Sequence, residues 1–126
     1  MSKPTVAILG ASRNRRKYGN KSVRAHVQQG YEVFPVNPHA AEIEGLKAYR
    51  DLASVPVKQL DRISVYLPPE VALGLLEEIQ NRGAKEVWFN PGSDSPEVVA
   101  RAEELGLDII RACSIVDIGA SPADFQ

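Results

Sequence analysis

The sequence has few of the residues that hold small proteins together by covalent or metal bonds. Cys113 is its only cysteine, and the 126 residues include two histidines. One cysteine cannot form an intramolecular disulfide, nor supply a zinc site built from several cysteines. The sequence therefore excludes the disulfide-rich and cysteine-zinc classes of small protein.

An excess of one charge and long apolar runs are also lacking. The formal net charge is -1, which gives no general attraction for nucleic acid or for an anionic membrane surface. No stretch approaches the roughly 18 apolar residues of a membrane span, and the first residues lack a signal-peptide pattern. We therefore expect a cytoplasmic protein with neither nucleic acid nor membrane as a partner, while a protein partner stays unknown.

The apolar content of 44% predicts one globular domain over residues 1–126. Short apolar runs that end at turn residues predict strands at 6–9, 31–36, 62–67, 86–89 and 107–110. The irregular stretch 37–61 is expected to hold a short edge strand within 42–49 and one helical turn at 52–55.

Three helices are expected between the strands. The first is capped by Asn20 or Ser22 and ends at Gly30, with Val23, His26 and Val27 inward. The second runs from Pro69 to Gly83 with Ala72, Leu75, Leu76 and Ile79 on one face, and the third from Ser95 to Gly106 with Val98, Val99, Ala102 and Leu105 inward. This alternation predicts a Rossmann-like, doubly wound α/β fold, with a parallel sheet of about five strands and helices on both faces.

In such sheets ligands bind beyond the carboxyl ends of the strands, beside the first strand. That strand ends at Gly10-Ala11-Ser12, where backbone amides and a hydroxyl favour phosphate binding. The dinucleotide fingerprint G-x-G-x-x-G is missing, since the next glycine is Gly19 and residues 13–17 carry four cations. The basic loop favours a ligand with more phosphate than one diphosphate, such as coenzyme A with its 3′-phosphate. A solvated surface loop is the alternative.

The other strand ends indicate the rest of the ligand. The second strand ends at Asn37-Pro38, where an NAD site would usually have an acidic residue, so NAD is disfavoured while NADP stays an alternative. Tyr66-Leu67-Pro68-Pro69 forms an apolar edge suited to adenine, and Asn90-Pro91-Gly92-Ser93 would let a pantetheine arm pass. Plain turns and a proline helix start explain the same residues without a ligand.

Taken in order, these segments resemble the small stand-alone CoA-binding proteins, whose domain is similar to the CoA-binding domain of the succinyl-CoA synthetase α subunit. The resemblance covers nearly the whole chain. The residues that carry it are 6–12, Lys17, 30–38, Glu42-Ile43 with Gly45, 64–69 and 83–85.

The resemblance implies a role for each segment. Gly10, Ala11 and Ser12 would hold the diphosphate, and Arg13, Arg16 and Lys17 the 3′-phosphate and ribose. Asn37 and Pro38 would flank the adenosine, Tyr66 to Pro69 would line the adenine slot, and Asn90 to Ser93 would lie towards the pantetheine.

The last strand departs from the family pattern. Relatives commonly continue with Arg-Cys-Pro and a lysine, whereas this chain has Ala112-Cys113-Ser114-Ile115. The resemblance therefore does not define the thiol end of the site. Cys113 stays a candidate ligand contact, able to form a mixed disulfide with coenzyme A, and a buried, inert thiol is the other interpretation.

No set of residues suggests catalysis. His26 and His39 have no serine or acid at a triad spacing, and we expect both to be structural or solvated. We therefore predict a non-catalytic protein that binds coenzyme A or an acyl-CoA as a sensor, carrier or accessory module. An NADP-binding redox enzyme or sensor and one subunit of a split acyl-CoA ligase are the alternatives.

Overall fold

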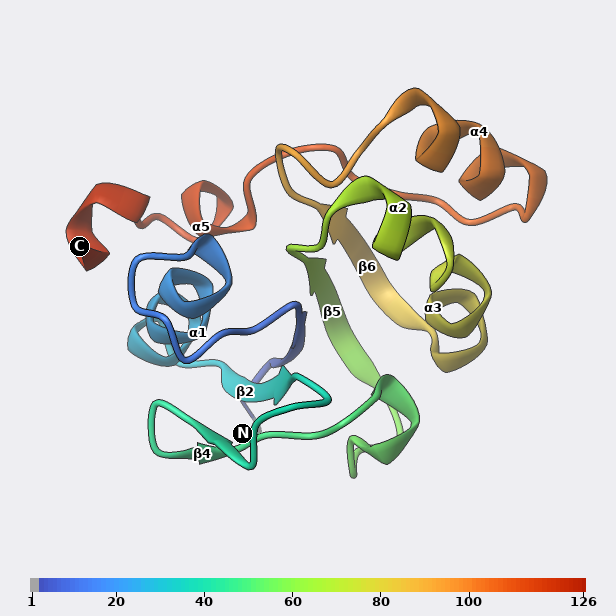
Figure 1. The fold of residues 1–126 in the computed structure, drawn as a ribbon. Coiled ribbons are helices and arrows are strands. Elements are labelled where there is room, and N and C mark those ends of the chain that lie inside the picture. The colour runs from blue at the N-terminus through green and yellow to red at the C-terminus, as the bar shows by residue number, and fades with distance from the viewer. Residues whose placement is uncertain (1–2) are drawn as a thin grey trace.

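The computed structural model describes residues 3–126 and has a parallel four-stranded sheet at its centre (Figure 1). Its strands are β1 (Thr5–Leu9), β2 (Glu32–Val36), β5 (Leu60–Val65) and β6 (Ala84–Phe89), in the order β2-β1-β5-β6. The order reverses between β1 and β5, so the chain winds from the centre towards both edges. The doubly wound α/β fold class is confirmed.

A single bridge extends the sheet at each edge. Tyr49 pairs with Val36 beside β2, and Ile110 pairs with Trp88 beside β6. The predicted strand at 107–110 was therefore wrong as a strand. Only Ile110 reaches the sheet, where its N–H donates to the carbonyl of Val87 and its carbonyl accepts from Phe89.

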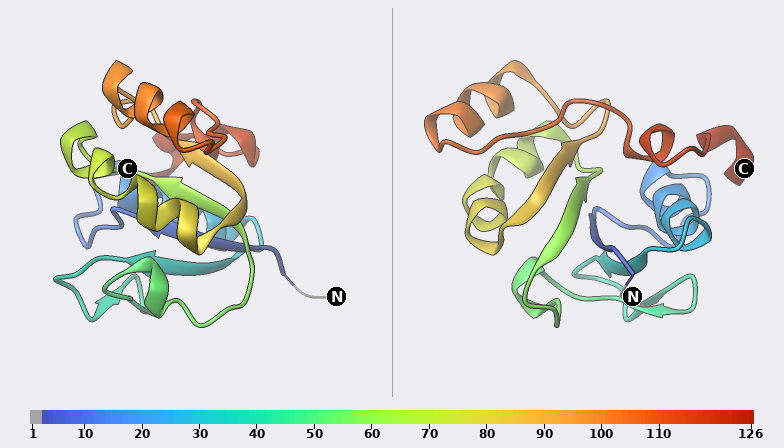
Figure 2. Two further views of the ribbon diagram at one scale, coloured as in Figure 1. Left: turned by 90° about the vertical axis from the view of Figure 1, so that its right-hand side faces the viewer. Right: turned by 180° about the vertical axis from the view of Figure 1, so that it is seen from behind.

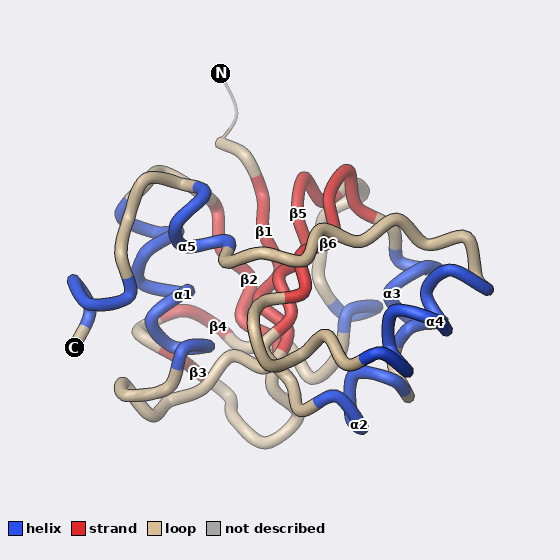
Figure 3. Tube along the Cα trace, turned by 90° about the horizontal axis from the view of Figure 1, so that it is seen from above, coloured by secondary structure: helices blue, strands red, loops and turns tan. Residues whose placement is uncertain are grey.

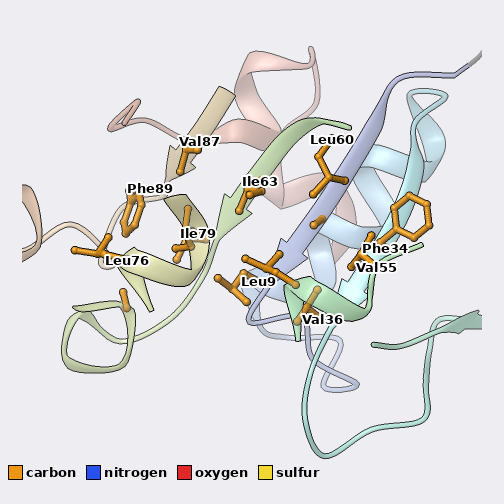
Figure 4. Close-up of a cluster of buried hydrophobic side chains, with 14 of the residues drawn as sticks. Leu9, Phe34, Val36, Val55, Leu60, Ile63, Leu76, Ile79, Val87 and Phe89 are labelled. Atoms are coloured by element: carbon orange, nitrogen blue, oxygen red, sulfur yellow. The ribbon is translucent and has the colours of Figure 1, made fainter. Parts of the chain in front are cut away.

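Helices cover both faces of the sheet (Figures 2 and 3). One face carries α1 (Tyr18–Gln28) and α5 (Ser114–Asp117), and the other carries α2 (Pro69–Leu73), α3 (Leu76–Arg82) and α4 (Pro96–Glu104). Most buried strand side chains are apolar on both faces, because helices cover both, although Arg62 and Ser64 of β5 are buried as well. Figure 4 shows the larger core, in which Leu9, Ile63 and Phe89 pack against Leu76 and Ile79.

Two helices differ from the sequence prediction. Helix α1 begins at Tyr18, so Asn20 and Ser22 lie inside it instead of capping it. Val23 and His26 are buried as predicted, but Val27 is 49% exposed. The helix predicted from Pro69 to Gly83 is divided at Gly74, a residue that weakens helices, so that α3 begins at Leu76.

Helix α4 agrees with its prediction. The hydroxyl of Ser95 caps it by accepting a hydrogen bond from the N–H of Val98, and Pro96 is its first residue. Val98 and Ala102 are fully buried, and Val99 and Leu105 are partly buried. No helix within residues 3–126 has the length and apolar character to cross a membrane.

The stretch 37–61 contains a hairpin and one helical turn. β3 (Glu42–Ile43) and β4 (Leu46–Lys47) pair antiparallel around Glu44 and Gly45, whose φ angles of 50° and 77° suit a two-residue hairpin turn. Asp51 caps the 3-10 helix η1 (Leu52–Ser54). The Arg82 guanidinium of α3 donates to the carbonyls of Leu52 and Val55, which holds η1 against α3.

The C-terminal segment is ordered. It forms α5 and the 3-10 helix η2 (Pro122–Phe125), and Phe125 is buried beside Ala25 of α1. The Arg24 guanidinium donates to the carbonyl of Phe125 at 2.6 Å. The segment therefore belongs to the layer that covers the α1 face of the sheet.

Candidate functional site

A cleft of about 790 Å³ lies where the strands end. Most of the residues predicted for the site line it: Gly10, Ala11, Ser12, Lys17, Asn37, Pro38, Tyr66, Leu67, Pro68, Pro91, Gly92 and Ser93. They come from the loops that follow β1, β2, β5 and β6. The fold therefore brings these segments, far apart in the sequence, to one edge of the sheet.

Two glycines allow the loop after β1 to pack tightly. Gly10 has a φ of 92°, and a Cβ there would lie 2.4 Å from the carbonyl oxygen of Tyr66. A Cβ at Gly19, in the first turn of α1, would lie 2.2 Å from the carbonyl oxygen of Gly10. Gly19 thus allows the close helix–strand packing that the last glycine of a dinucleotide fingerprint provides. Sequence reasoning noted Gly19 but gave it no role.

The start of α1 borders the cleft. Lys17, Tyr18 and Gly19 all line it, and the first turn of this 11-residue helix has no acidic side chain. The N–H groups of a helix's first turn lack partners within the helix and carry partial positive charge. Together with the amides around Gly10, they form a surface suited to an anion.

Side-chain amides hold this loop in place. Asn20 donates to the carbonyl of Ser12 at 2.8 Å, and Asn37, at the end of β2, donates to the carbonyl of Ala11 at 2.9 Å. Within the loop, Ser12 Oγ accepts from the N–H of Asn14, whose Oδ1 accepts from the N–H of Arg16 at 3.0 Å. The loop is therefore supported from α1 and from β2.

This turn leaves two of the predicted cations outside the cleft. Arg13 and Arg16 are exposed and do not line it, whereas Lys17 does. Arg50 and His39 line it as well. Arg50 comes from the stretch after β4, to which sequence reasoning gave no binding role, and its guanidinium forms an exposed ion pair with Asp51 at 3.6 Å.

The walls of the cleft contain more residues that sequence reasoning missed. Leu9, Val36, Val71 and Leu75 add apolar surface, and Asp51 and Glu78 add carboxylates. Leu75 was predicted on the inner face of a continuous helix, but the division at Gly74 leaves it partly buried and beside the cleft. Leu9 and Val36 end strands that the sequence predicts, whereas the other four residues come from elements that meet the cleft only in the folded chain.

Asn90 lies beneath the cleft and does not line it. It is 2% exposed, and its amide donates to Ser64 Oγ at 2.8 Å and accepts from the N–H of Ser114 at 2.8 Å. The hydroxyl of Tyr66 joins the same network through Ser114 at 3.0 Å. Burial raises the pKa of Tyr66 above its ordinary value.

Pro69 and Cys113 are the remaining predicted residues outside the cleft. Pro69 is the first residue of α2. Cys113 is a half-buried free thiol packed beside Ala25, Ile115 and Phe125. Its contact with a ligand stays a prediction.

The two histidines lie in different surroundings. His26 is a fully buried residue of α1, while His39 is exposed at the cleft, where its backbone N–H donates to Asn37 Oδ1 at 2.7 Å. Within the described part of the chain, no three histidine, cysteine, aspartate or glutamate side chains cluster in a way that could hold a metal ion. The cleft presents amides, hydroxyls, cations, the carboxylates of Asp51 and Glu78 and the ring of His39 between apolar walls.

Comparisons with known proteins agree with this arrangement. The family model described as CoA binding domain matches residues 4–119. An uncharacterized protein of Bacillus subtilis, YneT, is 28% identical over 105 residues, which are 83% of this chain and 77% of the relative. A conserved hypothetical protein from Pyrococcus furiosus has a solved structure that matches with a TM-score of 0.79 at 36% identity, covering 92% of this chain and 99% of the other.

A much larger protein matches over part of its length. The α subunit of an ADP-forming acetate-CoA ligase II from Pyrococcus furiosus is 31% identical over 85 residues. These residues are 65% of this chain but only 18% of the ligase subunit. The likeness therefore concerns one portion of that subunit.

Proposed function

Because the chain belongs to the CoA-binding domain family, we propose that it binds coenzyme A or an acyl-CoA in the cleft at its strand ends and catalyses no reaction alone. The observation that carries the proposal is the surface formed by Gly10, Ala11 and the first turn of α1, which adjoins an apolar cleft with cations at its rim. A diphosphate fits the amides of this surface, and a nucleoside and pantetheine fit the walls on either side.

Each part of the cleft has a partner in coenzyme A. The diphosphate would accept hydrogen bonds from the loop after β1, with the adenosine between Asn37-Pro38 and Leu67-Pro68. The pantetheine arm would leave along Pro91 to Ser93. The cations at the rim, Lys17 and Arg50, suit the 3′-phosphate.

The absence of a catalytic role is part of the proposal. The ligase relative is matched over 18% of its length, so the ligase activity stays with that protein. Among residues 3–126, the ring of His39 at the cleft has no carboxylate or hydroxyl partner, and its backbone N–H donates to Asn37 Oδ1. Binding as a sensor, carrier or accessory module needs no such group.

Calorimetric titration of the reduced protein tests the ligand directly. We expect coenzyme A and acetyl-CoA to bind with micromolar or tighter affinity, and NAD and NADP to bind at least about tenfold more weakly at the same salt concentration. Binding of NADP without binding of coenzyme A would contradict the proposal and favour a redox role instead.

The cations of the cleft give a second prediction. Lys17→Ala combined with Arg50→Ala is expected to weaken the binding of coenzyme A about tenfold more than that of 3′-dephospho-coenzyme A, because both residues line the cleft. The effect should shrink as salt is added, since both side chains meet solvent. Titrations of both ligands with each variant measure it.

Arg13→Ala combined with Arg16→Ala is the matched control, because it removes the same charge from the same rim outside the cleft. We expect this control variant to lower the affinities for the two ligands equally and only slightly. A larger selective loss in the Arg13 and Arg16 variant would show that the loop turns inward on binding and that the original sequence prediction holds.

A further inference from the structure

The end of the cleft away from the α1 turn is formed by two adjoining elements. Glu78 lines it from α3, and Asp51 lines it from the residue before η1. Arg82 of α3 bonds the carbonyl of Leu52 in η1 at 3.0 Å, so these two elements pack against each other. The two carboxylates therefore belong to one wall.

The two carboxylates differ in what they already bind. Asp51 Oδ1 accepts hydrogen bonds from the N–H and the hydroxyl of Ser54, at 2.9 and 2.6 Å, so it has a structural task. Glu77, on the same helix as Glu78, pairs with Arg101 at 3.0 Å. Among residues 3–126, the side chain of Glu78 has no hydrogen-bond or ion-pair partner. Its oxygens are free to accept from a ligand.

The surroundings of Glu78 restrict what that ligand group can be. The side chain is partly buried, and the cleft that it lines has apolar walls from Leu75, Val71 and Val36. A carboxylate only accepts hydrogen bonds, and beside apolar surface it gains most from a donor carried by an otherwise flat, apolar group. The amino group of an adenine ring meets both conditions.

We infer that Glu78 recognises the exocyclic amine of adenine and makes the cleft selective for adenine nucleotides. The inference rests on the proposed function, since it places the diphosphate at the Gly10 loop and the base across Leu9 and Val36 against α3. A base with an oxygen at this position would set one acceptor against another. A base with hydrogen there would leave the carboxylate without a donor.

The test compares ADP with purine riboside 5′-diphosphate, which lacks only the amine. The wild-type protein is expected to bind ADP about tenfold more tightly, the effect of one hydrogen bond to a partly exposed charged group. Glu78→Leu removes the acceptor and should bring the two affinities within about twofold, while Glu78→Gln keeps an acceptor oxygen and should retain part of the preference. Displacement of bound coenzyme A gives each affinity.

Glu77→Leu is the matched control, because it makes the same substitution one residue away on α3, outside the cleft. It should keep the full preference for ADP, and thermal unfolding of each variant shows that the domain stays folded. A wild-type protein that binds coenzyme A but does not distinguish the two diphosphates would overturn this inference and leave the proposed function standing. If coenzyme A itself fails to bind, both fail.

Discussion

Gly10→Ala is expected to lower the free energy of unfolding by about 4 kcal/mol and to abolish measurable binding of coenzyme A. The φ of 92° is costly for any residue with a Cβ, and here the Cβ would also meet the carbonyl oxygen of Tyr66 at 2.4 Å. Because the backbone fixes the position of the Cβ and the Tyr66 oxygen is itself a backbone atom, one of the two loops has to move. Urea unfolding and calorimetric titration measure the two effects.

Gly106→Ala separates the cost of the left-handed backbone conformation from the cost of a steric clash of the Cβ. Gly106 has a φ of 70° at the end of α4, but no atom lies within 4 Å of the position its Cβ would take. It should therefore lose only about 1 kcal/mol of stability, the cost of the left-handed conformation, and keep its affinity for coenzyme A. If the Gly10 variant were no less stable than the Gly106 variant and still bound the ligand, the tight packing of the loop would not matter for either property.

Acid is expected to lower the free energy of unfolding through His26, at a higher pH than that at which the protein's carboxylates take up protons. The pKa of His26 is lowered from 6.5 to about 4, mainly by burial and in part by the nearby charge of Arg62, and a hydrogen bond from the ring to the Ser22 carbonyl opposes this shift. Nδ1 lies 2.8 Å from that carbonyl and must carry the proton, which leaves Nε2 as the atom that acid would protonate. Nε2 has no hydrogen-bond partner among residues 3–126.

The direction and size of the effect follow from the two pKa values. In the unfolded chain His26 takes up a proton near pH 6.5, whereas in the folded chain it stays neutral down to about pH 4. Between these values the unfolded state binds more protons, so the free energy of unfolding falls as the pH falls, by about 2 kcal/mol at pH 5 and about 3 kcal/mol at pH 4. Above pH 7 this contribution is constant.

Urea unfolding at several pH values between 7 and 4.5 measures this loss. In His26→Gln the slope should disappear, because no group at that position titrates. In His39→Gln, which changes the exposed histidine at the cleft, the slope should stay. A slope that persists without His26 would assign the acid sensitivity to another group.

The parts of the site that sequence reasoning predicted share one property. Gly10 to Ser12, Asn37 and Tyr66 each follow directly after an apolar strand, and parallel strands end at one edge of a sheet. Local patterns in the sequence are therefore enough to gather them. Fold class follows from the same alternation of strands and helices.

The parts that were missed depend on turns and on packing between distant elements. The side chain of Asn14 bonds the N–H of Arg16, and this local turn leaves Arg16 outside the cleft although its neighbour Lys17 lines it. Arg50 and Glu78 reach the cleft only because η1 packs against α3, a contact that no repeat or spacing reveals. Gly74 divides a helix whose apolar spacing alone is continuous.

The single bridges at Tyr49 and Ile110 also bear on self-association. An uncovered strand edge offers a row of free N–H and C=O groups to which another molecule can add its own strand, which is a route to aggregation. Here each edge is covered near the cleft by one residue, and Pro35 removes a donor from β2. The stretches left open carry Glu32 and Lys85, whose charges oppose stacking of like edges. The sheet can therefore remain open at both sides while two like edges resist pairing with each other.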